Sequence, residues 1–479
     1  MSADSFYWHD YETFGANPRA DRPCQFAGLR TDLELRETGD PLVIYCRPTN
    51  DYLPHPEACL ITGITPQDAR RHGVPEPEFC AAISEVFSVP GTCGIGYNSI
   101  RFDDEVTRHL LYRNFFDPYA REYANGNSRW DLIDVVRLCY ALRPEGIQWP
   151  TREDGSPSFK LEHLADANGL ASGQAHDALN DVRATIALAR LIRSRQPRLF
   201  NYCFEHRRRQ QAATLLDVIR RNPVLHVSAR YPARRGCLAM VMPVCVNPTN
   251  SRAIIVYDLS VDPTPMLTLN ASDIADRVFT PSADLPDGVD RIPLKSVNTS
   301  HAPVLVPVSV LKNSDTARIH MEPERCLAHR EQIAAAGPEL STRVQQVFDR
   351  RGWEEPTDPE QALYSGGFAS AGDKRLIEQV RRTSPGDLAA LQDQFENARY
   401  RHLLFRYRAR HHPEALGPDE AERWLTLRRE KLTAGEPSPL DQARANLQQL
   451  RQDAGGDRMA VLDQLESYYL ELEQELLPV

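Results

Sequence analysis

Two acidic residues separated by a single position lie close to the N-terminus of this chain. They are Asp10 and Glu12 in the phrase Trp-His-Asp-Tyr-Glu-Thr-Phe-Gly. Alternate side chains of a strand leave the same face, so both carboxylates can converge on one point. Hard divalent cations such as Mg²⁺ and Mn²⁺ favour carboxylate oxygens and keep water or phosphate oxygens as further ligands. The pair therefore indicates a cation site, although Asp-x-Glu alone is also typical of an exposed strand end.

A second acidic group follows the phrase Asn-Ser-Ile-Arg-Phe, where a helical pattern begins. It consists of Asp103, Asp104 and Glu105. A carboxylate in the first turn of a helix commonly caps free backbone N–H groups, which is the alternative to a role as a metal ligand. Spacing alone does not choose among the three residues.

A histidine and an aspartate, His176 and Asp181, lie in the phrase His-Asp-Ala-Leu-Asn-Asp. A helix advances about 100° per residue, so two side chains with this separation point about 140° apart on one helix. We therefore place His176 in the loop before a helix and Asp181 one turn inside it. From there both side chains can lean toward the strand that carries Asp10. Asp177 is a second acidic candidate in the same phrase.

Alternating strand and helix patterns surround these residues and predict an α/β domain over residues 1–196. Strands are predicted at residues 5–11, 25–32, 42–47 and 93–97. Helices are predicted at residues 78–87, 103–114, 131–142, 161–168 and 178–194. Gln196-Pro197 ends the last helix, because a proline disfavours helical backbone in the residue before it.

The rest of the chain divides into a β-rich part and a helical part. Short β-branched runs with prolines and asparagines between them predict an all-β module from about residue 224 to residue 310, a small barrel within a domain over residues 197–350. Charged, leucine-containing segments predict an all-α domain over residues 353–474. Its helices are expected at residues 374–382, 387–410, 418–432 and 439–477.

Length and composition agree with this organisation. At 479 residues the chain exceeds one ordinary core, and a prior of roughly 150 residues per domain suggests about three domains. The formal net charge is -10, so a nucleic acid must be held by local basic patches. The 10 cysteines form no Cys-x-x-Cys pair, which argues against a zinc ribbon or a disulfide framework. With no signal-like N-terminus and no apolar run of about 20 residues, we expect a cytoplasmic protein without a membrane segment.

Longer phrases resemble a known family. The order Asp-x-Glu, then Asp, then His-x-x-x-x-Asp is similar to that of the DEDDh 3′→5′ exonucleases. Three phrases resemble bacterial exonuclease I in particular: Trp-His-Asp-Tyr-Glu-Thr-Phe-Gly, Gly-Tyr-Asn-Ser-Ile-Arg-Phe-Asp-Asp-Glu-Val-Thr-Arg and Asn-Ser-Arg-Trp-Asp-Leu-Ile-Asp-Val. The resemblance extends over all three predicted domains.

This resemblance implies a ribonuclease-H-like exonuclease domain, an SH3-like barrel and a helical C-terminal domain that together surround single-stranded DNA. It implies that two Mg²⁺ ions, with Mn²⁺ as a possible substitute, are held by Asp10, Glu12, Asp103 and Asp181. His176 then takes a proton from the attacking water, a role that suits an imidazole with a pKa near 6.5. The resemblance also selects Asp103 over Asp104 and Asp181 over Asp177.

The implied activity is the removal of 5′-mononucleotides from the 3′ end of single-stranded DNA by a monomer, in DNA repair and recombination. An exoribonuclease with the same site is the alternative among enzymes, and it differs in recognising the 2′-hydroxyl. A non-catalytic single-strand binder is the alternative among binding proteins. A non-catalytic binder would be expected to lack one of the carboxylates or the histidine, whereas this chain has all four carboxylates and the histidine.

Single strands are held by cationic grooves and by aromatic side chains that stack on bases. The residues expected to contact the strand, besides Glu12, are Arg108, Tyr119, Tyr123, Arg137, Lys160 and Lys295. Residues 60–65 resemble the family loop that meets the terminal nucleotide, with a β-turn after a strand as the alternative. Arg143 and Tyr202 resemble the basic ridge that receives the acidic C-terminal tail of single-strand-binding protein.

Overall fold

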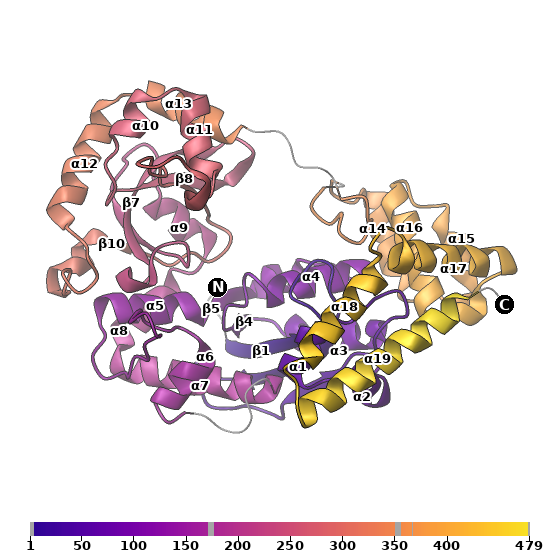
Figure 1. The fold of residues 1–479 in the computed structure, drawn as a ribbon. Coiled ribbons are helices and arrows are strands. Elements are labelled where there is room, and N and C mark those ends of the chain that lie inside the picture. The colour runs from indigo at the N-terminus through magenta and orange to yellow at the C-terminus, as the bar shows by residue number, and fades with distance from the viewer. Residues whose placement is uncertain (1–3, 171–176, 350–355, 366, 478–479) are drawn as a thin grey trace. The chain divides into compact units, whose positions relative to one another are not determined.

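A mixed β-sheet near the N-terminus carries the first pair of acidic residues. Four of its five strands are, in spatial order, β3 (Leu42–Tyr45), β2 (Pro23–Thr31), β1 (Ser5–Thr13) and β4 (Thr92–Gly96). β1 runs antiparallel to β2 and parallel to β4, and β2 runs antiparallel to β3. Figure 1 labels β1 and β4, which are neighbours in this sheet. An internal strand needs apolar cover, and Phe6, Trp8 and Tyr11 of β1 are buried accordingly.

The computed structural model describes residues 4–170, 177–349, 356–365 and 367–477. The chain divides into two compact units. The first unit consists of Met1–Ser128, Ser172–Arg183 and Glu354–Val479, and the second of Arg129–Ala171 and Ala184–Trp353. Among the described residues, no helix combines the length and the apolar character that crossing a bilayer requires.

The helices of the first unit come from both ends of the chain. The N-terminal ones are α1 (Pro56–Thr62), α2 (Pro66–His72), α3 (Glu76–Ser88) and α4 (Asp103–Arg113). The C-terminal ones are α14 (Ala371–Val380), α15 (Ala389–Gln392), α16 (Ala398–His411), α17 (Pro418–Thr433), α18 (Pro439–Arg451) and α19 (Asp457–Leu476). The first turn of α7 (Ala178–Arg195) also belongs to this unit.

Two hydrophobic clusters join the sheet to these helices. The cluster with α3 and α4 contains Tyr7, Tyr11, Phe26, Phe79, Ile83, Phe87, Val106 and Leu110. The cluster with α1, α2, α18 and α19 contains Phe14, Cys24, Cys59, Ala69, Leu447, Leu462, Leu465 and Tyr469. The C-terminal helices are therefore part of the same core as the sheet that carries Asp10 and Glu12.

The second unit contains a five-stranded antiparallel sheet and helices. The chain enters it through β5 (Ser128–Asp131). The sheet has the order β10 (Leu305–Pro307), β6 (Val224–Val227), β7 (Leu238–Asn247), β8 (Asn250–Asp258) and β9 (Leu294–Asn298). Besides most of α7, the helices are α5 (Leu132–Leu142), α6 (Leu161–Ala167), α8 (Pro197–Glu205), α9 (Arg209–Leu215), α10 (Thr264–Thr268), α11 (Ala271–Phe279), α12 (Pro323–Ala335) and α13 (Glu339–Phe348).

The predicted α/β, β-rich and helical segments are confirmed, but the all-β description of residues 224–310 is wrong. Helices α10 and α11 interrupt this part between β8 and β9. The side chain of Asn270 caps α11 by accepting from the Asp273 N–H, and Ile274, Ala275 and Val278 are buried. This spacing has the period of a helix with one apolar face. The prolines and asparagines nearby favoured a prediction of short strands and turns instead.

Two predicted C-terminal helices are each divided in two. Residues 387–410 form α15 and α16, and Asn397 begins the second of these by capping the Arg399 N–H. Residues 439–477 form α18 and α19, because Gly456 adopts a φ of 55° between them, which favours glycine. The β-turn alternative for residues 60–65 is also wrong. This stretch ends α1 at Thr62 and reaches Thr65, which caps α2.

Replacing Leu465 by alanine should destabilise the protein, because this side chain is fully buried in the cluster that joins α19 to the sheet. We expect a loss of about 2–5 kcal/mol in the free energy of unfolding, measured by urea denaturation. Leu470→Ala is the matched control on the same helix, since Leu470 is 47% exposed, and its effect should stay within about 0.5 kcal/mol. Equal losses in both variants would contradict this account of the core.

Candidate active site

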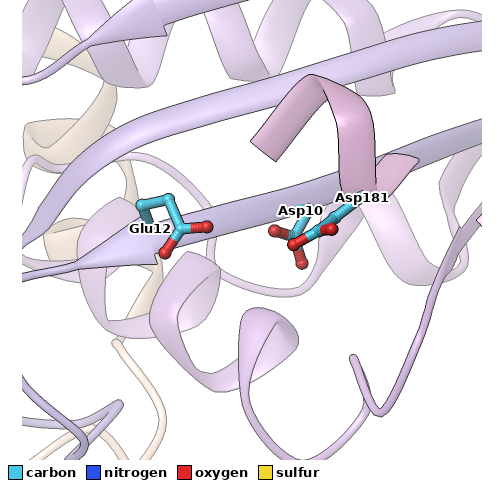
Figure 2. A group of neighbouring side chains, drawn as sticks. All are labelled: Asp10, Glu12 and Asp181. Atoms are coloured by element: carbon cyan, nitrogen blue, oxygen red, sulfur yellow. The ribbon is translucent and has the colours of Figure 1, made fainter. Parts of the chain in front are cut away.

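Three carboxylates meet beside the central strand of the sheet. Asp10 and Glu12 come from β1, and Asp181 comes from the first turn of α7. One carboxylate oxygen of each lies within 4.8 Å of the others, which is close enough for a shared metal ion (Figure 2). Glu12 is buried, while Asp10 and Asp181 are partly exposed. The structure thus confirms that the two residues of Asp-x-Glu converge and that Asp181 lies one turn inside its helix.

Asp103, the first residue of α4, lies beside the same strand. Its Oδ1 accepts a hydrogen bond of 3.0 Å from the backbone N–H of Tyr11, which stands between Asp10 and Glu12. No side chain caps the start of α4 at Phe102. The Asp103 carboxylate is therefore directed at the strand that carries the acid pair.

The neighbours of Asp103 have other partners. Asp104 forms an ion pair with Arg121 at 2.5 Å, and both side chains are buried. Glu105 forms an ion pair with Arg108 at 2.5 Å. These contacts distinguish Asp103, whose carboxylate binds the backbone of β1, from Asp104 and Glu105, whose carboxylates pair with arginines.

Asp177, the alternative to Asp181, also has other hydrogen-bond partners. The Oδ1 atom of Asp177 accepts hydrogen bonds from the N–H groups of Leu179 and Asn180, so this carboxylate caps α7. Asp177 is absent from the group of three acids that share the cation position. His176 lies outside the described residues.

The acids raise one another's pKa values. Burial, followed by the charges of Asp103, Glu12 and Asp181, raises the pKa of Asp10 well above its usual range. Burial, followed by the charges of Asp181 and Asp103, raises the pKa of Glu12 to about 8. Like charges disfavour ionisation of one another when they share a poorly solvated site. A divalent cation relieves this repulsion, and an all-oxygen donor set suits a hard ion, so the residues present fit a metal-binding site.

Two hydroxyl groups that were not among the predicted site residues hold this arrangement in place. The Thr107 hydroxyl contacts the backbone carbonyl of Asp103 at 2.7 Å and the hydroxyl of Tyr11 at 3.0 Å. Tyr11 lies between the two acids of β1, and Thr107 stands one helical turn after Asp103. The available signal was therefore a hydroxyl residue at position i+4 on the helix that begins with an acid.

Three of the residues expected to contact DNA lie in the first unit. Arg108 is buried between Glu105 and Glu122, with a nitrogen–oxygen distance of 2.7 Å to the latter. Its guanidinium lies 5.6 Å from the centre of the Tyr119 ring. Tyr123 is 67% exposed. Tyr123 is thus open to a base, while Arg108 already has two carboxylate partners.

The other three lie in the second unit. The side chain of Lys160 is 65% exposed, and its Nζ is 3.2 Å from a carboxylate oxygen of Glu162. Arg137 is buried and donates to Asp134 at 2.6 Å. The Nζ of Lys295 lies 4.7 Å from the centre of the Tyr231 ring. Lysine at position 160 offers a point charge without the two-pronged geometry of arginine.

The two residues of the expected partner site also lie in the second unit. Arg143 donates to the Ser314 hydroxyl at 2.6 Å and to the backbone carbonyl of Val310 at 3.2 Å. The ring of Tyr202 stacks on that of His206 with 3.9 Å between the ring centres. Both side chains are partly exposed.

Carboxylates gathered around the central strand of a mixed sheet form a metal-binding site of the kind that metal-dependent hydrolases such as nucleases use. Three family models match the chain: Exonuclease over residues 7–189, Exonuclease I SH3-like domain over residues 207–350, and Exonuclease I C-terminal domain over residues 357–472. They confirm the predicted fold classes, including the SH3-like class of the middle segment.

Whole-chain comparisons agree. The chain is 44% identical to exodeoxyribonuclease I of Escherichia coli, with 98% of both chains covered. A solved structure of exonuclease I from Methylocaldum szegediense is 48% identical, with a TM-score of 0.92 and coverage of 98% of this chain and 99% of that one. E. coli exonuclease I in complex with a dA16 oligonucleotide gives a TM-score of 0.94 at 43% identity, with coverage of 98% and 100%. The chain belongs to the exodeoxyribonuclease I family.

Replacing Glu12 by glutamine should stabilise the metal-free protein in a pH-dependent way. Because burial and the neighbouring acids raise the folded-state pKa of Glu12 from 4.5 to about 8, the wild type loses stability as pH rises through this interval. Glutamine carries no charge, so the variant escapes this loss. In the presence of chelator we expect a gain on the order of 2 kcal/mol at pH 8 that shrinks toward pH 5, measured by thermal denaturation.

Glu85→Gln is the control for this comparison, because Glu85 is exposed on α3. Its melting temperature should follow that of the wild type at each pH. A Glu12→Gln gain that stays constant between pH 5 and pH 8 would show that repulsion among the acids is not its cause.

Proposed function

We propose that this protein is an exodeoxyribonuclease that degrades single-stranded DNA from the 3′ end and releases 5′-mononucleotides, in DNA repair and recombination. The observation that carries the proposal is the convergence of Asp10, Glu12 and Asp181 within 4.8 Å, with Asp103 bound to the strand between the first two. The proposal is supported by the family to which the chain belongs. E. coli exonuclease I, at 43% identity, has been solved as a zinc-bound complex with single-stranded DNA.

Asp10, Glu12, Asp103 and Asp181 would hold two Mg²⁺ ions, with Mn²⁺ as a substitute. When bound, a pair of such ions lowers the pKa of the attacking water and stabilises the departing 3′ oxygen of the phosphodiester. The chain's own residues supply the charge that balances the cations, and the bond from Tyr11 N–H orients Asp103. His176 takes the proton from the attacking water, since a neutral imidazole can accept it near pH 7.

We propose that Tyr119 and Tyr123 stack on bases and that Lys160 and Lys295 bind phosphates. For Arg108 and Arg137 the same role requires that a DNA phosphate compete with their carboxylate partners, because both are buried and paired. Glu12 would also contact the terminal nucleotide. Residues 60–65, where Gly63 has a φ of 69°, would approach the same nucleotide with their backbone.

We further propose that Arg143 and Tyr202 bind the acidic C-terminal tail of single-strand-binding protein. Arg143 offers a cationic fork, and such a fork suits a tail that ends in a carboxylate. A relative with 42% identity has been solved as SSB/Exonuclease I in complex with the inhibitor CFAM. Three domains over residues 1–196, 197–350 and 353–474, a monomeric state and a cytoplasmic location complete the proposal.

An assay with end-labelled substrates tests this function directly. The purified protein should shorten single-stranded DNA from its 3′ end in Mg²⁺, yield 5′-mononucleotides, and lose all activity in chelator. RNA of the same sequence and blunt duplex DNA serve as parallel substrates. Degradation of RNA at a higher rate than DNA would replace the proposal with an exoribonuclease, and persistence of all three substrates would refute it.

The role of His176 predicts a separation of binding from turnover. His176→Ala should bind Mn²⁺ and single-stranded DNA as the wild type does, yet lose on the order of 10²–10⁴ in kcat, because general-base catalysis contributes about that factor. Binding is measured by calorimetry and turnover by product release. His72→Ala, at an exposed position that ends α2, is the control and should keep full turnover. Near-normal kcat in His176→Ala would exclude the assignment as base.

A further inference from the structure

The turn that follows the acid pair in β1 is attached to the C-terminal helical part of the chain. This turn, residues 14–22, is closed by a hydrogen bond of 2.9 Å from the Phe14 N–H to the Arg22 carbonyl. The side chain of Arg22 is almost fully buried, and its guanidinium donates to Oε2 of Glu360 at 2.6 Å. Glu360 lies more than 300 positions further along the chain, in the same compact unit.

Glu360 itself is held by two arginines of α16. Arg410 forms an ion pair with its carboxylate, and Arg406 lies 3.6 Å away. Arg410 also binds Asp51 through two nitrogens, at 2.9 and 2.7 Å. Burial opposes the charge of Glu360, but Arg410 and Arg22 hold its pKa well below the usual range. Glu360 is therefore a buried anion with fixed partners on either side.

The segment around Glu360 also contacts α4, the helix that begins with Asp103. We call residues 358–364 the clasp segment. The ring nitrogen Nδ1 of His109 lies 3.2 Å from the Glu360 carbonyl oxygen, and the Tyr112 hydroxyl donates to the Pro359 carbonyl at 3.2 Å. The Tyr364 hydroxyl lies 2.9 Å from the Glu105 carboxylate. The clasp segment thus binds both the turn after Glu12 and the helix that presents Asp103.

We propose that Glu360 is a positioning residue for the metal site: it sets the separation between the end of β1 and α4, and so between the carboxylates of Glu12 and Asp103. This inference rests on the proposed function. Metal sites require ligand distances within about 0.2 Å of their preferred values, and a buried cation that loses its partner must move or draw in water. Without the Glu360 charge, Arg22 keeps, among the described residues, only the longer ion pair with Glu76, at 4.0 Å, so its hold on the turn against α4 is weakened.

On this inference, the C-terminal part of the chain affects the geometry of the metal site. It contacts the turn after Glu12 and the helix that begins with Asp103, the two elements whose acids must converge. This explains why residues 354–479 form one compact unit with the sheet and α4. It also implies that a core cut after residue 196 would bind divalent metal poorly.

The test uses the full-length protein with Glu360→Gln, which keeps the shape of the side chain and removes its charge. Calorimetric titration with Mn²⁺ should show about 10-fold weaker binding than the wild type, the size of effect that a group orienting metal ligands commonly has. The Mg²⁺ concentration for half-maximal activity should rise by a similar factor, while kcat at saturating Mg²⁺ stays within about twofold. A purely structural role would lower the melting temperature and leave the Mn²⁺ affinity of the folded protein unchanged.

Glu420→Gln is the matched control. Glu420 pairs with buried Arg408 at 2.6 Å in the same helical part of the chain, between α16 and α17. Its loss removes the carboxylate partner of another buried arginine without touching the clasp segment, so Mn²⁺ affinity should equal that of the wild type. A 10-fold loss in this control as well would overturn the specific role of Glu360.

A second variant keeps the inference testable if Glu360→Gln does not fold. Tyr364→Phe removes the hydroxyl that contacts Glu105 and accepts a hydrogen bond from Arg108, both on α4. We expect Mn²⁺ binding about threefold weaker with an unchanged melting temperature. Wild-type affinity in every folded clasp variant would refute the inference while leaving the proposed function standing. Weaker Mn²⁺ binding in the clasp variants of a protein that does not cut DNA would refute the proposed function and support the clasp.

Discussion

Electrostatic repulsion among the acids around β1 is the constraint on which this structure depends. Four carboxylates are brought to one side of a strand where burial has removed much of the water that screens them, and the raised pKa values of Asp10 and Glu12 express the resulting strain. Such a group does not assemble by its own attraction. The surrounding fold must hold it together, and a divalent cation is the partner that makes the arrangement favourable.

Aromatic packing and backbone hydrogen bonds supply the holding force. β1 is an internal strand, and the side chains on either side of its acids are buried against α3 and α4. The Tyr11 N–H and the Thr107 hydroxyl connect this strand to the first turn of α4. Each contact is modest in free energy, about 1 kcal/mol for a typical hydrogen bond, but together they fix the direction of Asp103. Precision at the site therefore depends on packing rather than on the acids.

The C-terminal helices pack against the sheet and stabilise it. Their apolar residues share a cluster with Cys24 of β2 and with Phe14, which follows β1, and Glu360 pairs with Arg22 of the turn after the acid-bearing strand. A buried charge pair adds little net stability compared with an apolar pair of the same shape, but breaking it leaves a charge without compensation. Such pairs suit a role in positioning, where one geometry must be preferred over near alternatives.

Sequence alone was sufficient for the strands predicted at residues 5–11 and 93–97, which correspond to β1 and β4, and for the helices that begin at residues 103 and 178. It was also sufficient for Asp10, Glu12 and Asp181 as a cluster. These features follow from local periodicity and from phrases that resemble a family. The sequence did not predict α10 and α11 or the breaks within the last helices. Without the family resemblance, it also could not choose between Asp103 and Asp104. In each case the deciding interaction was a cap, a glycine backbone angle or a partner distant in the chain.

The amino-acid sequence by itself determined which elements form and which side chains carry charge, because propensity and periodicity are local properties. Tertiary structure decided which carboxylates share a cation and which are occupied by arginines. It also decided that a glutamate 338 positions beyond Arg22 lies against the turn that follows the site. The physical reason is that ion pairing and desolvation depend on distances of a few ångströms in space, and residues far apart in the chain acquire these distances only when the core has packed.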